Sequence, residues 1–301
     1  MNSLIFPSYV QKGDRVIILS PSSKIDKSFL KGAKKRLKSW GLEVVMAKHA
    51  GSSHGTYGGS IKQRVEDLQN ALDDEKAKVI LCSRGGYGVV HLLEHFEPGL
   101  WSRDPKWVMG FSDISAFHAA LAHDGVASIH SLMCKHLTER PDDECSRALR
   151  DILTGTMPDY EVAADPHNRL GEAEGRIYGG NIAVLSGLLS TPFNLLRKDH
   201  ILFIEDIDEA IYSIERMLYH LRLNGTLAST RALIVGQFTE YKPSKDFDNM
   251  YDMVQRMVAD YDFPVAYNFP VGHVDYNLPI IEGANARLVV TPDKVRLTLS
   301  K

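Results

Sequence analysis

The first half of the chain alternates short apolar runs with segments of helical periodicity, and this alternation limits the possible folds more than any other feature. The apolar runs, which predict strands, lie at residues 15–20, 42–46, 78–82, 107–109 and 126–129. Apolar side chains recur at helical spacing over residues 29–37, 61–72 and 114–121. Strands and helices that alternate at this spacing predict a parallel sheet covered on both faces. Ligands of such sheets bind at the carboxyl ends of the strands.

The second half of the chain has a different pattern, so we expect two domains. Residues 155–175 are rich in Pro, Asp, Asn and Gly and have no helical period, which predicts a polar connection. We place the boundary near residue 165, between domain 1–165 and domain 166–301. In the second domain, β-type runs predominate over helices. These runs lie at 201–204, 232–235, 287–290 and 295–299, and one helix is expected at 211–221.

Charge and composition exclude several classes of protein. The 301 residues carry a net charge of -3 with both signs scattered, which argues against nucleic acid as a partner. No run approaches the roughly 18 consecutive apolar residues of a membrane helix. Residues 1–15 lack the pattern of a secretory signal, so we expect a cytoplasmic protein with no membrane partner. Three cysteines in such a protein are expected to be free thiols.

One serine follows a predicted strand and precedes a helix. The hydroxyl of Ser112 would project from the top of the sheet, and the N–H groups of the helix turn would point at whatever it attacks. The segment GFSD at 110–113 is not the G-x-S-x-G elbow of hydrolases, because Ile114 replaces the second glycine. On this segment alone, helix N-capping by Ser112 is the simpler interpretation.

A glycine-rich turn, SRGGYG at 83–88, follows the strand predicted at 78–82. It matches neither the dinucleotide-binding G-x-G-x-x-G nor a P-loop, although a phosphate cradle is one interpretation. Tight-turn geometry also explains the glycines. A third interpretation is that the backbone N–H of Gly86 is exposed as a donor to an oxyanion.

The sequence HLLEH at 91–95 matches the inverted zinc-peptidase motif H-x-x-E-H. In that motif two histidines four residues apart on a helix bind one zinc ion. The same residues also form an ordinary amphipathic helix with Leu92 and Leu93 facing inward, and the sequence identifies no third ligand. We therefore favour structural roles for His91 and His95 and predict no metal or other cofactor.

Four carboxylates in five positions, EDIDE at 205–209, follow the strand predicted at 201–204. They would suit a magnesium site, a pair of acid–base groups or a solvated helix start. A helix start accounts for Asp208 and Glu209, whereas Glu205 is better placed to point into a cleft. His273 ends the segment FPVGH, a loop framed by Pro and Gly, although a lone loop histidine is commonly incidental.

Taken in order, these segments resemble the LD-carboxypeptidases (muramoyltetrapeptide carboxypeptidases), a serine peptidase family that also includes microcin C immunity peptidases. The resemblance extends over nearly the whole chain, and the ordered set is far more specific than any single segment. The matching stretches are KGDRVIILSPSS at 12–23, GGSIKQRVEDLQNAL at 58–72, ILCSRGGYG at 80–88, GFSD at 110–113, GGNIAVL at 179–185, ILFIEDIDEAIYSIERML at 201–218, and FPVGH with LPIIEGANARL within 269–288.

The resemblance implies a Ser-Glu-His triad, which falls here on Ser112, Glu205 and His273. It also implies a flavodoxin-like N-terminal domain, a smaller C-terminal domain of β-rich swivelling architecture, and a homodimer. The overall expectation is thus a two-domain α/β protein whose active site lies in the interdomain cleft. In the serine mechanism, the backbone N–H groups of Gly86 and Asp113 would bind the tetrahedral oxyanion.

For the substrate, the resemblance implies the L,D bond between a diamino acid and the terminal D-Ala of a murein tetrapeptide, during recycling of peptidoglycan fragments. A free carboxylate calls for a cation. Arg84 is a candidate, and a structural tie beneath the glycine turn is an equal alternative. Two other functions stay open. One is a microcin-type immunity peptidase that cleaves aminoacyl-nucleotide conjugates, for which the sequence places no aromatic stacking surface. The other is a non-catalytic module that binds a small ligand.

Overall fold

A six-stranded sheet organises the N-terminal part of the chain in the computed structural model, which describes residues 4–196 and 199–301. Its strands are β1 (Arg15–Leu19), β2 (Glu43–Met46), β3 (Ala77–Cys82), β4 (Trp107–Gly110), β5 (Ser128–His130) and β11 (Ile280–Glu282), in the order β11-β5-β4-β3-β1-β2. Strands β1 to β5 pair in parallel. Their order, 2-1-3-4-5, is that of flavodoxin-like doubly wound sheets, so the predicted fold class is confirmed.

Each helix of this part buries apolar side chains, and a capping side chain fixes the start of some of them. They are α1 (Lys27–Ser39), α2 (Ile61–Asp73), α3 (Val90–Leu93), α4 (Leu100–Arg103), α5 (Ser115–His123), α6 (Cys134–Glu139), α7 (Glu144–Thr154) and the 3₁₀ turn η1 (Ser112–Ile114). Asp26 caps α1 by accepting the N–H of Ser28, and Ser60 and Gln63 form a capping box at α2. Strands β3 and β4 are almost entirely buried, which explains their continuous apolar runs.

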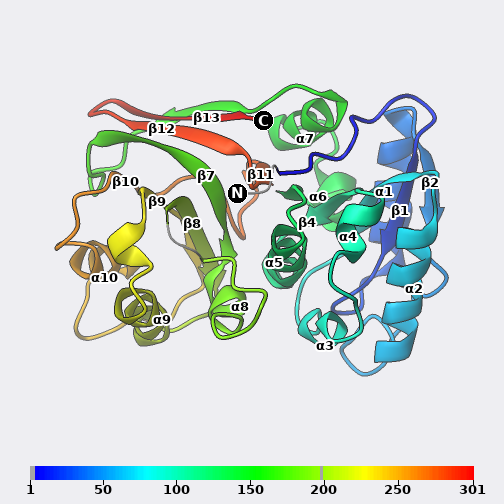
Figure 1. Cartoon of the computed structure of the whole chain (residues 1–301), viewed down its shortest axis with the longest axis horizontal. Helices are drawn as coiled ribbons and strands as arrows, with labels where there is room; N and C mark the ends of the chain where they lie inside the picture. Colours follow the sequence, from blue (N-terminus) through cyan, green and yellow to red (C-terminus); the bar gives the residue numbers. More distant parts are fainter. Residues whose placement is uncertain (1–3, 197–198) are drawn as a thin grey trace. The chain divides into compact units, whose positions relative to one another are not determined.

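A seven-stranded mixed sheet organises most of the remaining chain (Figure 1). Its strands are β6 (Asp159–Ala163), β7 (Gly171–Asn181), β8 (His200–Ile207), β9 (Ala232–Thr239), β10 (Val265–Ala266), β12 (Asn285–Val290) and β13 (Lys294–Ser300), in the order β10-β9-β8-β7-β12-β13-β6. Strands β7 to β10 are parallel, whereas β7, β12, β13 and β6 pair antiparallel. The helices are α8 (Ile182–Ser186), α9 (Ile211–Leu223), α10 (Met250–Met257) and the 3₁₀ turn η2 (Leu227–Ser229).

The interpretation of residues 155–175 as a polar connection is wrong, because the segment contains β6 and the start of β7. Strand β6 alternates exposed and half-buried residues, and ion pairs across strands replace the apolar contacts that a sequence pattern would reveal. These pairs join Asp159 to Arg296 at 2.6 Å, Glu161 to Lys294 at 2.8 Å and Glu172 to Arg287 at 2.7 Å.

The chain divides into two compact units, each built on one of the two sheets. Unit 1 comprises residues up to Thr156 together with Leu278–Ile281, and unit 2 comprises Met157–Asn277 together with Glu282–Lys301. The domain limit expected at residue 165 stays a prediction. Within the described ranges, no helix has the length and apolar character needed to cross a membrane.

Candidate active site

The loops that follow β1, β3 and β4 meet at the carboxyl edge of the sheet in unit 1. In the order 2-1-3-4-5, the crevice between β1 and β3 is the usual ligand site, because the strand order reverses there. The N–H of Ser23, after β1, donates to the carbonyl oxygen of Gly85, after β3, at 3.3 Å. The hydroxyl of Ser22 donates to the carboxylate of Asp113, after β4, at 2.6 Å. The two segments predicted to carry function, 83–88 and 110–113, therefore share one location.

Ser112 forms the turn from β4 into α5 with a strained backbone. Its φ is 66°, a left-handed value that costs a non-glycine residue about 1–3 kcal/mol. The N-cap of α5 is Ile114 and that of the preceding 3₁₀ turn is Phe111, neither with a side-chain capping bond. The interpretation of Ser112 as a helix N-cap is therefore wrong. A strained serine at the end of a central strand has the geometry of a presented nucleophile.

Two glycines let the turn after β3 approach this serine. A Cβ on Gly85 would lie 2.7 Å from the Cβ of Ser112 and 2.9 Å from its hydroxyl oxygen. Gly86 has a φ of 114°, and a Cβ there would lie 2.2 Å from the hydroxyl oxygen of Ser23. Only glycine fits at either position, so the backbone of this turn runs close to the side chains of Ser112 and Ser23. The donor roles of Gly86 and Asp113 stay predictions.

Arg84 is exposed, and its guanidinium donates a hydrogen bond to the backbone oxygen of Lys24 at 3.1 Å. This bond ties the glycine turn to the loop after β1, which is the structural role considered for this residue. Its second candidate role, binding of a substrate carboxylate, stays a prediction.

Arg64 is hydrogen-bonded to the loops after β1 and β3 and was not predicted from the sequence. The residue is only 2% exposed, and its Nη1 atom donates to the backbone oxygens of Pro21 at 2.7 Å and Gly88 at 2.8 Å. The available signal was its spacing, because Arg64 lies four residues before the buried Leu68 on α2. The expected apolar position, Ile61, is exposed instead.

Asp113 is the buried anion that complements Arg64. Its carboxylate accepts the N–H of Val89 at 2.9 Å in addition to the hydroxyl of Ser22. Burial raises the pKa of Asp113, and these hydrogen bonds together with the charge of Arg64 oppose that rise. The carboxylate thereby links the residue after Ser112 to the end of the glycine turn.

The inverted zinc motif does not form on one helix. Helix α3 ends at Leu93, so His95 lies beyond it, while Leu92 and Leu93 are buried as expected. The Nδ1 atom of His91 lies 3.3 Å from the guanidinium of Arg64. In the described part of the chain, no group of three or more His, Cys, Asp or Glu residues is arranged to hold a metal ion.

Unit 2 brings together two of the residues predicted for the triad. Glu205 lies within β8, which continues to Ile207, and its side chain is fully buried. Its Oε2 atom lies 2.7 Å from the Nδ1 atom of His273. Ser112 belongs to unit 1, and its partnership with this pair is part of the proposal below.

The backbone before His273 is shaped to make this contact. Gly272 has a φ of 130°, and a Cβ there would lie 2.9 Å from the Cβ of Glu205. Its N–H donates to the side-chain oxygen of the buried Asn277 at 3.0 Å. A glycine at this position is therefore required both by its φ and by the close approach to Glu205.

The electrostatics around His273 favour its charged form. Burial by itself lowers the pKa of His273, but the hydrogen bond to Glu205 and the charge of that carboxylate outweigh it, so the pKa is raised. The charges of Asp206 and Glu240 act in the same direction. A carboxylate in this position can orient an imidazole and stabilise its cation, which is the role that the carboxylate has in serine triads.

Asp206, the next residue, stabilises the end of β8. Its carboxylate accepts the side-chain amide of Asn181 at 2.9 Å and the N–H of Ala183 at 2.9 Å. Burial, followed by the charge of Glu205, raises the pKa of Asp206 to about 7. Asp208 and Glu209 lie before Ala210, which is the N-cap of α9. The first turn of α9 contains no acidic residue.

Glu282 is a further buried carboxyl group, and it was not predicted from the sequence. Only 1% of the residue is exposed, and it accepts the N–H of Gly179 at 3.1 Å. Burial raises the pKa of Glu282 well above its ordinary value. Its position inside the apolar stretch LPIIEG was the one available signal.

The sequence matches one family over most of its length. Residues 16–131 match the LD-carboxypeptidase N-terminal domain and residues 174–288 match the LD-carboxypeptidase C-terminal domain. A protein of Synechocystis sp. with the name "Putative carboxypeptidase" is 33% identical over 285 residues, which cover 94% of this chain and 93% of that protein. The chain belongs to the LD-carboxypeptidase family. The predicted family is thus confirmed, and membership supports a hydrolase of the peptidase class.

Other proteins are similar to this chain in sequence or in structure. The "Probable murein peptide carboxypeptidase" of Bacillus subtilis is 30% identical over 293 residues, covering 94% of this chain and 91% of that protein. The muramoyltetrapeptide carboxypeptidase from Oxalobacter formigenes has a TM-score of 0.87 at 26% identity, covering 95% of this chain and 99% of that chain. The microcin C7 self-immunity protein MccF also has a TM-score of 0.87, covering 99% and 98%, but at 21% identity it shows the fold alone.

Proposed function

We propose that this LD-carboxypeptidase is a serine enzyme that releases the terminal D-Ala of a murein tetrapeptide. The observation that carries the proposal is the 2.7 Å contact between buried Glu205 and Nδ1 of His273. If Nδ1 donates its proton to Glu205 in this contact, Nε2 is the ring nitrogen that accepts and returns a proton during the reaction. The strained backbone at Ser112 and the close approach of the glycine turn support its assignment as the nucleophile.

In the first half of the reaction, the hydroxyl oxygen of Ser112 attacks the carbonyl carbon of the scissile amide. Its proton passes to Nε2 of His273, and the imidazolium is stabilised by Glu205. The carbonyl oxygen becomes an oxyanion, which accepts hydrogen bonds from the N–H groups of Gly86 and Asp113. Each such donor contributes roughly 3–4 kcal/mol to transition-state stabilisation.

In the second half, the imidazolium returns its proton to the leaving nitrogen, so that the C–N bond breaks and D-Ala departs. The shortened peptide stays attached to Ser112 as an ester. A water molecule then attacks this ester, with His273 again accepting and returning a proton, and the enzyme is regenerated.

The direct test is mass spectrometry of a murein tetrapeptide before and after incubation with the protein. We expect the loss of one D-Ala and formation of the tripeptide, and no product with the Ser112→Ala protein. Because Ser112 is part of no hydrophobic core, this substitution is expected to change the free energy of unfolding by about 1 kcal/mol or less. Full turnover by Ser112→Ala would refute the serine mechanism and favour a different nucleophile.

One observation favours a second candidate, an immunity peptidase that cleaves aminoacyl-nucleotide conjugates. Aromatic side chains gather beside the glycine turn, with ring centroids of Tyr57 and Tyr87 6.3 Å apart and that of His91 5.2 Å from Tyr87. Tyr87 is 57% exposed, so it offers the flat surface that a nucleobase would need. An assay with murein tetrapeptide and with an aminoacyl sulfamoyl adenosine conjugate separates the two. Turnover of the conjugate alone would reject the murein substrate.

The remaining parts of the proposal concern context. We expect a homodimer that acts in the cytoplasm on recycled peptidoglycan fragments. Light scattering on purified protein measures the mass, and a monomer at micromolar concentration would contradict the dimer. Fractionation of the source cells tests the compartment. A non-catalytic binding module would instead bind the tetrapeptide and leave its mass unchanged.

A further inference from the structure

The loop that delivers His273 is held by side chains outside the predicted triad. Residues 267–273 follow the short strand β10 and contain no helix or strand. Asn268 has a φ of 57°, a left-handed conformation that asparagine tolerates better than most residues. Five residues after this turn, the chain presents the imidazole to Glu205. The conformation at Asn268 therefore sets the direction of the segment that ends in His273.

Gln237, on β9, fastens this loop at three points. Its side-chain amide donates to the Oδ1 atom of Asn268 at 2.8 Å and to the backbone oxygen of Phe269 at 3.2 Å. Its backbone N–H donates to the carbonyl oxygen of Val271 at 2.9 Å. Gln237 also forms a parallel β-bridge with Gly272, the residue before His273. One residue thus fixes the loop from its left-handed turn almost to the histidine.

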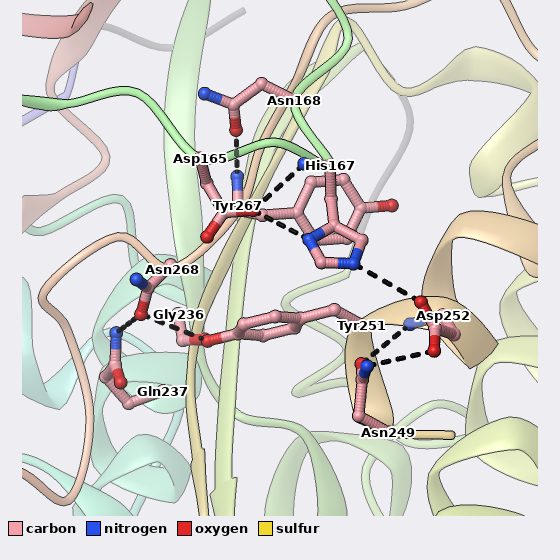
Figure 2. A network of polar contacts seen from close by, with 10 residues as sticks. All are labelled: Asp165, His167, Asn168, Gly236, Gln237, Asn249, Tyr251, Asp252, Tyr267 and Asn268. Carbon is pink, nitrogen blue, oxygen red and sulfur yellow. Dashed lines mark hydrogen bonds and ion pairs between the residues drawn. The ribbon is translucent and has the colours of Figure 1, made fainter. Parts of the chain in front are cut away.

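Tyr251 holds the same turn from α10 (Figure 2). Its hydroxyl lies 3.2 Å from the backbone oxygen of Gly236 and 3.4 Å from the Oδ1 atom of Asn268. A hydroxyl has one proton to donate, so these two acceptors share it. Gly236 precedes Gln237 in the chain, and Asn268 also accepts the side-chain amide of Gln237. The side chains of Gln237 and Tyr251 therefore both contact Asn268.

A network of polar contacts orients Tyr251 in turn. Asn249, the N-cap of α10, accepts the N–H of Asp252 at 3.0 Å. The imidazole of His167 lies between two carboxylates, 2.7 Å from Asp165 and 3.2 Å from Asp252 (Figure 2). The ring of Tyr251 packs edge-on against the ring of Tyr267, with centroids 5.7 Å apart. Helix α10 is therefore anchored at the turn that carries Tyr251.

We propose that Gln237 and Tyr251 are positioning residues for the reaction, which hold the Asn268 turn so that His273 meets Glu205 in the productive orientation. This inference rests on the proposed function, because it assigns His273 the role of the base. Asn268 itself is exposed, so water competes for its hydrogen bonds and each contributes only modestly. Loss of one tie should lower kcat several-fold without abolishing it.

The chain offers a matched pair of substitutions. Tyr251→Phe removes a hydroxyl that contacts the loop, whereas Tyr267→Phe removes a buried hydroxyl that has no hydrogen-bond partner among the described residues. We expect Tyr251→Phe to lower kcat three- to tenfold at unchanged KM, and Tyr267→Phe to leave kcat within twofold. Gln237→Met, which keeps the length of the side chain and removes its amide, should lower kcat at least as much as Tyr251→Phe.

Substitutions of Asn268 separate the role of its side-chain oxygen from that of its left-handed backbone. Asn268→Asp keeps an oxygen acceptor and tolerates the left-handed turn, so it should retain most activity. Asn268→Gly keeps the backbone conformation but has no acceptor, so it should resemble Tyr251→Phe. Equal activity of these two variants would overturn the proposal, because the side-chain oxygen would then have no role.

A readout independent of turnover separates this inference from the proposed function. The contact with Glu205 raises the pKa of His273, so a loosened loop should move the NMR titration of that imidazole to lower pH. We expect this shift in Tyr251→Phe and its absence in Tyr267→Phe, with similar thermal unfolding midpoints. An unshifted titration in Tyr251→Phe would overturn the positioning role. If the wild-type protein cleaves no tetrapeptide, the proposed function fails, and the titration still decides whether Tyr251 positions His273.

Discussion

Replacement of Glu205 by glutamine probes the contact on which the proposed mechanism depends. Glutamine has the same shape but no charge, so the side chain still fits the fully buried position within β8. The imidazolium that forms during catalysis would then have lost its buried counter-ion. In addition, the Oε1 atom of Glu205 has no hydrogen-bond partner among the described residues, so an amide NH₂ group placed there finds no acceptor. If the glutamine amide is flipped instead, its NH₂ group faces Nδ1 of His273 and favours the unproductive tautomer of the imidazole.

The size of the effect follows from the burial of the pair. Breaking a buried ion pair by removal of one partner costs about 3–5 kcal/mol, and each 1.4 kcal/mol or so of barrier changes the rate about tenfold. We therefore expect Glu205→Gln to lower kcat by about 10²- to 10⁴-fold. The measurement is release of D-Ala from murein tetrapeptide, followed by mass spectrometry over time.

The pH dependence gives a second, independent readout. A neutral His273 is needed as the base, so the acidic limb of kcat/KM reports its pKa. Glu205 raises that pKa, and its neutralisation should move the limb to lower pH. Glu240→Gln is the matched control, because Glu240 is exposed and acts on His273 through its charge alone. Activity of Glu205→Gln within threefold of wild type, or an unmoved acidic limb, would refute the reasoning.

Three further predictions concern the surroundings of the site. Gly85→Ala should lower kcat at least tenfold and also lower the thermal midpoint, because the added Cβ would lie 2.7 Å from the Cβ of Ser112 and the two segments would have to move apart; wild-type kcat would contradict this. Arg84→Met should raise KM at least tenfold for a peptide with a free carboxylate if Arg84 binds that group, whereas an unchanged KM leaves only its bond to Lys24. Burial, followed by the charge of Glu205, raises the pKa of Asp206 to about 7, so its contribution to stability is complete below the ordinary value near 4 and is lost as pH rises through 7. Thermal melts from pH 4 to 8 should show a weaker pH dependence for Asp206→Asn than for wild type, and equal slopes would count against this assignment.

The sequence predicted best those elements that local burial determines. The apolar runs at 15–20 and 78–82 became β1 and β3, and the predicted helix at 61–72 became α2. A strand that is buried on both faces has a continuous apolar run, and a helix that is buried on one face has apolar residues at helical spacing. For the site, the local pattern predicted only that Ser112 and Glu205 each come directly after a strand. The pairing of Glu205 with His273 came from the resemblance to the family.

The elements that sequence reasoning missed depend on partners far along the chain. Strand β6 is stabilised by ion pairs with β13, more than 130 residues away, so its own residues carry no apolar signal. Arg64 and Glu282 are charged residues at buried positions, and their acceptors and donors come from other loops and strands. The strained backbone at Ser112 cannot be predicted from the residue type alone. Such features become visible only when the chain is folded.

The most direct test of the mechanism is covalent labelling of the protein by a serine-directed fluorophosphonate. We expect one label per chain, located on Ser112 by peptide mapping, and labelling at least a hundredfold slower in His273→Ala. A label on another residue, or labelling of Ser112 at the same rate without the imidazole, would contradict it.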